Sequence, residues 1–280
     1  MQYYRGKRVI VTGGSAGIGR ATAVRLASAG AHVVVAARGQ SRLDETVQAM
    51  REANGSVTVG SVSVDVTDPS AVEAAIADGV AQLGGLDILV CNSGYAHTGP
   101  VHEVPADDFT SLLNVNYLGH VHTVRSAVPH LIESKGDICL VSSMLGFMSL
   151  WGYGAYSASK YAITGFAEAL RQEMTLHDVR VTLFYPPTTK TPGLEKENED
   201  KHPMLWALES ESGWNKVYTA DEVASGLLKA IPSRRFHTCV GLDSWILYTA
   251  ARYLPGFTRW MSDIELRKAA RKVSERSAAS

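Results

Sequence analysis

The chain alternates short apolar runs with longer segments in which apolar residues recur every three or four positions. Runs such as 9–11 are β-branched and short, which is typical of strands buried in a parallel sheet. The longer segments have the period of amphipathic helices. Strands that alternate with helices of this length predict βαβ units, and therefore an α/β fold with one doubly wound parallel sheet flanked by helices.

The predicted elements divide the chain into a regular part and two irregular parts. Strands are predicted at 9–11, 32–37, 57–64, 87–91, 137–142, 179–185 and 236–240. Helices are predicted at 18–29, 41–53, 69–83, 106–133, 156–177 and 220–231. We therefore expect one α/β domain over residues 1–242, with a segment outside the alternation at about 186–218. An amphipathic helical tail is expected at 243–280.

Composition excludes several classes of function. The 280 residues contain 27 basic and 28 acidic side chains, so nucleic acid is not an expected partner. The three cysteines, Cys91, Cys139 and Cys239, each lie in an apolar run without metal-ligand spacing, and they predict buried thiols in a reducing compartment. No metal site is expected. The first strand begins near residue 8 and no run of about 20 apolar residues exists, so we expect a cytoplasmic protein.

Tyr156 and Lys160 are four positions apart within a predicted helix, so they share one face of it. A free tyrosine has a pKa of about 10 and is a poor proton shuttle at neutral pH. We expect the Lys160 ammonium to lower the pKa of the Tyr156 phenol, and a cationic nicotinamide ring to lower it further. The pair could then act as a general acid for carbonyl reduction, with Ser143 brought beside it by the fold. The motif alone also occurs on solvated helices.

A glycine-rich segment joins the first strand to the first helix. Glycines there let the backbone approach a pyrophosphate, and the helix N-terminus offers free N–H groups to it. A tight turn without a ligand is the alternative interpretation. The candidate cofactor-binding residues of this segment are Gly13, Ser15, Ala16, Gly17, Ile18 and Gly19.

Residues at the ends of the next strands suggest which dinucleotide binds. Arg38 follows the second strand, and Arg42 lies just beyond it; arginines there accommodate the 2′-phosphate of NADPH. The alternative is that both are ordinary surface charges. Asp65 and Val66 close the third strand and can bracket the adenine. Asn92 and Gly94 follow the fourth strand and can flank the ribose.

These motifs together resemble the short-chain dehydrogenase/reductase family over about residues 6–240. The matching set is Thr12-Gly13 with Gly17-Ile18-Gly19, Asn92-Ser93-Gly94, Asn116, Ser143, and Tyr156 with Lys160. The resemblance implies oxidoreduction of an alcohol or ketone with NAD(P)(H). It implies that residues 1–242 form a Rossmann-type dinucleotide-binding and catalytic domain, with a lid or substrate loop at about 186–218. It also implies that Tyr156 donates the proton, Ser143 steadies the carbonyl oxygen, Lys160 holds the nicotinamide ribose, and Asn116 anchors a water relay.

The family pattern also assigns a position after the sixth strand. Thr191 takes the place of a threonine that usually meets the cofactor, whereas Pro186-Pro187 replaces the usual Pro-Gly and stiffens the loop under the nicotinamide. Asn92-Ser93-Gly94 has serine where alanine is usual. Members of the family usually form homodimers or homotetramers through the helices predicted at 106–133 and 156–177.

Within the family, three segments are similar to those of 3-ketodihydrosphingosine reductases. They are 185–198, 13–15 and 155–163. The similarity implies NADPH-dependent reduction of a long-chain keto lipid, 3-ketodihydrosphingosine, to dihydrosphingosine in sphingolipid synthesis. A second hypothesis is another ketoreductase of the family, acting on a steroid, an acyl thioester or a xenobiotic. A third is a cofactor-binding regulator without chemistry, which would not need the four residues Asn116, Ser143, Tyr156 and Lys160.

Apolar side chains suggest where a lipid could bind. Leu145, Trp151 and Tyr153 belong to a run between Ser143 and Tyr156 that suits an apolar chain, although ordinary core packing explains it equally well. The tail from 244 mixes aromatic and apolar residues with cations, which predicts peripheral contact with a membrane face. Packing of the tail on its own domain or on a second subunit is as probable.

Overall fold

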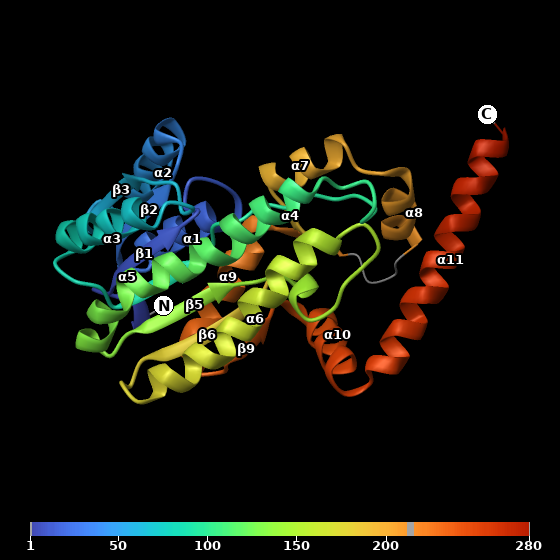
Figure 1. The fold of residues 1–280 in the computed structure, drawn as a ribbon. Helices are drawn as coiled ribbons and strands as arrows, with labels where there is room; N and C mark the ends of the chain where they lie inside the picture. The colour runs from blue at the N-terminus through green and yellow to red at the C-terminus, as the bar shows by residue number, and fades with distance from the viewer. Residues whose placement is uncertain (1, 212–215, 280) are drawn as a thin grey trace.

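The computed structural model describes residues 2–211 and 216–279, and it contains a central seven-stranded sheet (Figure 1). The strand order is β3-β2-β1-β4-β5-β6-β9, and neighbouring strands are parallel. This is the doubly wound sheet that the sequence predicts. The strands are β1 (Arg8–Thr12), β2 (His32–Ala37), β3 (Val59–Ser63), β4 (Ile88–Cys91), β5 (Asp137–Val141), β6 (Arg180–Tyr185) and β9 (His237–Cys239). β3 and β9 are shorter than predicted.

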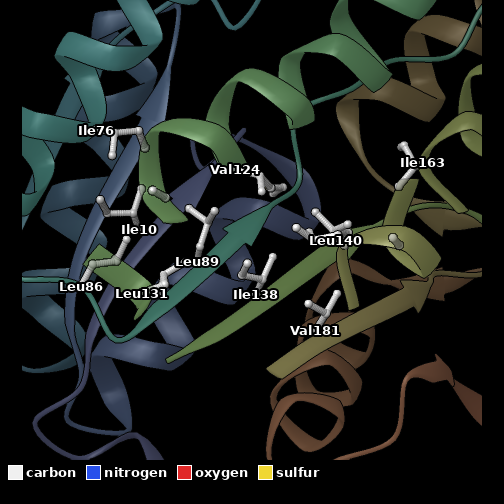
Figure 2. Packing of buried hydrophobic residues seen from close by; sticks show 14 of the residues in the cluster. Ile10, Ile76, Leu86, Leu89, Val124, Leu131, Ile138, Leu140, Ile163 and Val181 are labelled. Atoms are coloured by element: carbon white, nitrogen blue, oxygen red, sulfur yellow. The ribbon is translucent and has the colours of Figure 1, made fainter. Parts of the chain in front are cut away.

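Helices cover both faces of the sheet because successive strand side chains point to opposite sides. One face packs against α3 (Pro69–Leu83), α5 (Gly119–Ser134) and α6 (Gly154–Thr175), as Figure 2 shows for Ile10 and Leu89 of the sheet with Ile76 and Val124 of the helices. The other face packs against α1 (Gly17–Ser28), α2 (Gln40–Ala53) and α9 (Ala220–Ala230). These helices leave the carboxyl ends of the strands free for a functional site.

The segment predicted as one helix at 106–133 is interrupted. It comprises α4 (Ala106–Leu112), a π-helical turn η2 (Leu113–Leu118), and α5. A π turn inserts one extra residue, and such turns are frequent at functional sites. Its residues have the same apolar spacing as the flanking helices, so the sequence pattern did not reveal it.

The region expected to form a lid contains its own small elements. They are β7 (Thr189–Lys190), α7 (Pro192–Glu199), α8 (Pro203–Glu211) and β8 (Tyr218–Thr219). β7 and β8 pair in parallel, which anchors the two ends of the segment to each other. We call α7, α8 and the residues between them the lid. Part of the predicted 186–218 loop, residues 212–215, lies outside the described residues.

The tail forms α10 (Gly241–Tyr253) and α11 (Pro255–Ala279), separated at Pro255. Trp245 and Tyr248 of α10 pack against the core on the face of the sheet that α3, α5 and α6 cover. Residues of α11 pack instead on the lid, through Ala269 and its neighbours. Among the described residues, no helix combines the length and the apolar character needed to cross a membrane.

Candidate active site

The loop between β1 and α1 is shaped for close approach of a ligand to its backbone. Gly13 and Gly17 have φ of +64° and +52°, a left-handed conformation that favours glycine. A Cβ on Gly19 would lie 2.2 Å from the Gly13 carbonyl oxygen, so a side chain there would push the helix away from the loop. Within the described chain, no side chain caps α1 at Ala16, which leaves the first-turn N–H groups available to an anion.

The remaining residues of this loop have different surroundings. Ser15 and Ala16 are partly exposed at the loop, as a phosphate-binding role requires. Ile18 packs against the core cluster beneath α1 and α2. A structural role is therefore sufficient to explain Ile18.

Two further strand ends meet the glycine-rich loop. The Asn92 backbone N–H donates to the Thr12 hydroxyl at 3.1 Å, and its side-chain amide donates to the Gly13 carbonyl at 3.2 Å. A Cβ on Gly17 would lie 3.0 Å from a methyl carbon of Thr191, so Thr191 flanks the loop from the side of the lid. The Pro186 carbonyl accepts a hydrogen bond from the Met144 N–H at 3.4 Å.

The expected adenine end is open and charged. Arg38 and Asp65 are exposed, and their charged atoms are 4.0 Å apart. The pKa of Asp65 is lowered, first by the backbone N–H of Thr67 and to a smaller degree by Arg38. Val66 is buried beside them. Arg42 is exposed on the first turn of α2, and the structure shows no side-chain contact that joins it to Arg38. We call this group, with the glycine-rich loop, the cofactor end.

Asn116 is fully buried in the π turn and points toward α6. Its side-chain amide donates to the Tyr95 carbonyl and to the Ser159 hydroxyl, both at 2.9 Å, and its oxygen accepts from the Tyr95 N–H at 3.0 Å. A Cβ on Gly94 would lie 3.0 Å from the Asn116 oxygen and 3.4 Å from the Lys160 ammonium. The absence of a side chain at Gly94 therefore lets three parts of the predicted site meet.

Ser143, Tyr156 and Lys160 also converge. Ser143 caps the short 3₁₀ turn η3 (Met144–Gly146) after β5, and its hydroxyl is hydrogen-bonded to the Tyr156 phenol. The Lys160 ammonium lies 5.7 Å from the centre of the Tyr156 ring and donates to the Val141 carbonyl at 3.3 Å. The helical spacing and the end of β5 thus bring the three side chains to one place.

The pKa of the Tyr156 phenol differs from the sequence-based expectation. Burial raises it to about 12; the hydrogen bond to Ser143 lowers it, and the charge of Glu197 raises it. Burial also lowers the pKa of Lys160 to about 8. The expected lowering of the tyrosine pKa by Lys160 is wrong for the protein chain by itself, because the ammonium contacts a backbone carbonyl and desolvation dominates.

The family follows from comparison with known proteins. The family model described as short chain dehydrogenase matches residues 7–202. The chain belongs to the short-chain dehydrogenase family. It is therefore an oxidoreductase that acts on CH–OH or C=O groups. The sequence-based assignment to this family is confirmed.

Relatives and solved structures support the same family. The chain is 37% identical to the 3-ketodihydrosphingosine reductase of Bos taurus, over 86% of this chain and 73% of that protein. It is 39% identical to the 3-dehydrosphinganine reductase of Danio rerio, with the same coverage. A short chain dehydrogenase from Burkholderia cenocepacia in complex with NADP is 30% identical, with a TM-score of 0.75 over 86% of this chain and 98% of that one. One from Mycobacterium paratuberculosis bound to NAD is 28% identical, with a TM-score of 0.76 and the same coverage.

This short-chain dehydrogenase has an apolar cluster above Tyr156. The lid contributes buried Leu205 and Leu208, and α11 contributes buried Ala269. Leu145, Leu150, Trp151, Tyr153 and Tyr156 join them from the segment after β5. The structure therefore brings the three predicted substrate residues together with Tyr156, and it adds the lid and the tail to the same cluster.

A buried group of charges in the lid was missed by the sequence analysis. The Lys201 ammonium is 1% exposed and lies 3.4 Å from Glu197 and 2.9 Å from Glu209. The Tyr153 hydroxyl donates to the Glu197 carboxylate at 2.5 Å, and its oxygen lies 3.1 Å from the Glu209 carboxylate. The Tyr153 and Tyr156 rings are 6.1 Å apart, so this group joins the lid to the start of the helix that carries Tyr156. We call Tyr153, Glu197, Lys201 and Glu209 the lid charge cluster.

Proposed function

We propose that the chain is an NADPH-dependent reductase that converts the ketone of a long-chain lipid, 3-ketodihydrosphingosine, into the corresponding alcohol. The observation that carries the proposal is the convergence of Ser143, Tyr156 and Lys160 beneath the apolar cluster of the lid and α11. The names and the 37–39% identity of the vertebrate relatives support the substrate. An apolar cover suits a long alkyl chain, to which each buried methylene contributes roughly 0.8 kcal/mol.

The proposed cofactor fits the cofactor end. The glycine backbone around Gly13 and the free first-turn N–H groups of α1 would hold the pyrophosphate. Arg38 is free enough of Asp65, at 4.0 Å, to reach a 2′-phosphate, which favours NADPH over NADH. Lys160 would bond the nicotinamide ribose, and Thr191 would border the ring. When bound, the reduced nicotinamide supplies a hydride to the carbonyl carbon.

The chain's own residues handle the proton. The Tyr156 phenol, whose pKa is raised to about 12, stays protonated at neutral pH and can donate its proton to the carbonyl oxygen as the C–O π bond breaks. The Ser143 hydroxyl, already bonded to that phenol, orients the same oxygen. The buried chain of Asn116 and Ser159 lies behind Lys160, where water could restore the proton.

A substrate and cofactor panel tests the proposal. NADPH oxidation is followed by absorbance with 3-ketodihydrosphingosine, a short ketone, a steroid ketone and an acyl thioester, each with NADPH and NADH. We expect the highest kcat/KM with NADPH and 3-ketodihydrosphingosine. Faster turnover of one of the other ketones would favour the alternative ketoreductase, and turnover of none would favour the regulator.

We also propose that the protein forms at least a dimer. Leu113 and Leu118 of η2 and Tyr161 of α6 are each more than a third exposed, although all three are large and apolar. They belong to the segments through which the family usually dimerises. Light scattering coupled to gel filtration measures the mass in solution, and a monomer would contradict the proposal.

A further inference from the structure

The outer face of α10 and its turn into α11 carry large apolar side chains that the described part of the chain leaves uncovered. Their exposed fractions lie between 48% and 76%. They are Leu242, Ile246, Tyr253, Leu254, Phe257 and Trp260. We call these six residues the elbow. Figure 1 shows the turn between α10 and α11 projecting beyond the sheet and the helices that cover it.

The elbow is separate from the face of α10 that packs on the protein. Leu242, Ile246 and Tyr253 recur at intervals of four and seven, so they lie along one side of the helix. Trp245 and Tyr248 lie on another side and pack into the core. An apolar second side is therefore unnecessary for the stability of the fold. Contiguous exposed apolar surface of this kind marks an interaction site.

Beyond the turn, the aromatic residues continue the same surface. The Phe257 and Trp260 rings contact each other, with centroids 5.9 Å apart, yet both remain about half exposed. Tyrosine and tryptophan are the residues enriched where a protein meets the headgroup region of a bilayer, because one end of each ring is apolar and the other polar.

The charge around the elbow is positive although the whole chain is nearly neutral. Residues 242–280 contain seven of the 27 basic residues and four of the 28 acidic residues. Arg252 and Arg259 are exposed within the elbow segment itself. Apolar and aromatic groups flanked by cations complement an anionic lipid surface.

We propose that the elbow docks on the surface of an anionic membrane. The aromatic and aliphatic side chains enter the headgroup region, and Arg252 and Arg259 contact lipid phosphates. Farther along α11, Leu266, Ala269 and Val273 pack on the lid, so the docked helix is in direct contact with the cover of the apolar cluster. Docking of the elbow holds the protein at a surface where long-chain lipids are found, and α11 joins the elbow to the lid.

A second copy of the chain is a less suitable occupant of the elbow. A two-fold contact places the same patch of both copies together. Arg252 and Arg259 of one copy would then approach Arg252 and Arg259 of the other, and like charges at close range destabilise association. An anionic bilayer removes this repulsion.

Vesicle binding of the full chain tests the proposal without substrate or cofactor, so its outcome is independent of the reaction. The wild-type protein should float with phosphatidylcholine–phosphatidylserine vesicles and far less with phosphatidylcholine alone. The double variant Phe257→Ser/Trp260→Ser should lose at least about tenfold in vesicle affinity, as expected for two large side chains. Arg252→Gln/Arg259→Gln should reduce binding and its salt dependence.

Leu176→Ser provides a matched control, because Leu176 is 84% exposed at the end of α6, outside the elbow. This variant should bind like the wild type, and circular dichroism should show that all variants keep the fold. Tryptophan emission should shift to the blue on vesicle addition, and Trp260→Phe should reduce that shift. Equal binding by Phe257→Ser/Trp260→Ser and the wild type would overturn the proposal. Loss of self-association in that variant, without vesicle binding by the wild type, would also overturn it in favour of a contact between copies.

Discussion

The cofactor end and the lid hold their charges in opposite ways. Arg38 and Asp65 are exposed and 4.0 Å apart, so water screens them and leaves Arg38 free for a ligand. The Lys201 ammonium is 1% exposed and lies against two carboxylates. The first arrangement suits recognition, and the second fixes a covering segment in place. Substitutions at the two places should therefore have different consequences.

Removing the buried cation should have the largest effect on stability. Lys201→Met removes the buried cation that lies against Glu197 and Glu209, which costs about 3–5 kcal/mol. We expect a lower Tm and faster hydrogen exchange in α7 and α8. Lys135→Met is the control, because Lys135 and Asp178 form an exposed pair that water screens. Equal effects of the two substitutions would contradict the distinction between buried and exposed ion pairs.

Changing the charge at the cofactor end should alter cofactor preference and leave stability nearly unchanged. In Arg38→Asp, a carboxylate repels the 2′-phosphate and can bond a ribose hydroxyl, so the preference for NADPH over NADH should fall about ten- to a hundredfold. The ratio of kcat/KM values for the two cofactors measures this change. Arg51→Asp, at the other end of α2, serves as the control. An unchanged ratio in Arg38→Asp would show that Arg38 is an ordinary surface charge.

The smallest predicted effect concerns pH. Alcohol oxidation needs the Tyr156 phenolate, so its rate should rise with pH as that phenol loses its proton. The charge of Glu197 raises the pKa of Tyr156, and Glu197→Gln should therefore move this rise to lower pH, by about one unit or less. Initial rates of NADP⁺ reduction with dihydrosphingosine provide the measurement. Glu195→Gln, exposed on the same helix, should keep the wild-type profile, and a shift to higher pH in Glu197→Gln would contradict the electrostatic explanation.

Local sequence was sufficient to predict the sheet and the residues at its strand ends. β-branched runs identify the buried strands, and Gly13, Gly17 and Asn92 lie next to those runs in the chain. The order of the strands then brings these residues together. Tyr156 and Lys160 were also accessible to prediction, because helical spacing alone puts them on one face.

The buried charges of the lid could not be predicted in the same way. Lys201 stands in a strongly charged segment and resembles a solvated side chain. Its burial depends on Glu197, Glu209 and the Trp206 ring, which surround its ammonium in the folded lid. The π turn at Asn116 has the same apolar spacing as an α-helix, so only the fold reveals the inward position of that side chain. The pKa of Tyr156 was predicted in the wrong direction, because desolvation depends on the complete structure.

Tyr156→Phe removes only the phenol that we propose donates the proton in ketone reduction. Turnover of 3-ketodihydrosphingosine with NADPH should fall by about 10²–10⁴-fold, because the general acid is lost. NADPH affinity, measured by fluorescence titration, should stay close to that of the wild type. Tyr161→Phe, an exposed change on the same helix, should keep full turnover. Wild-type turnover in Tyr156→Phe, with the cofactor still bound, would contradict the account.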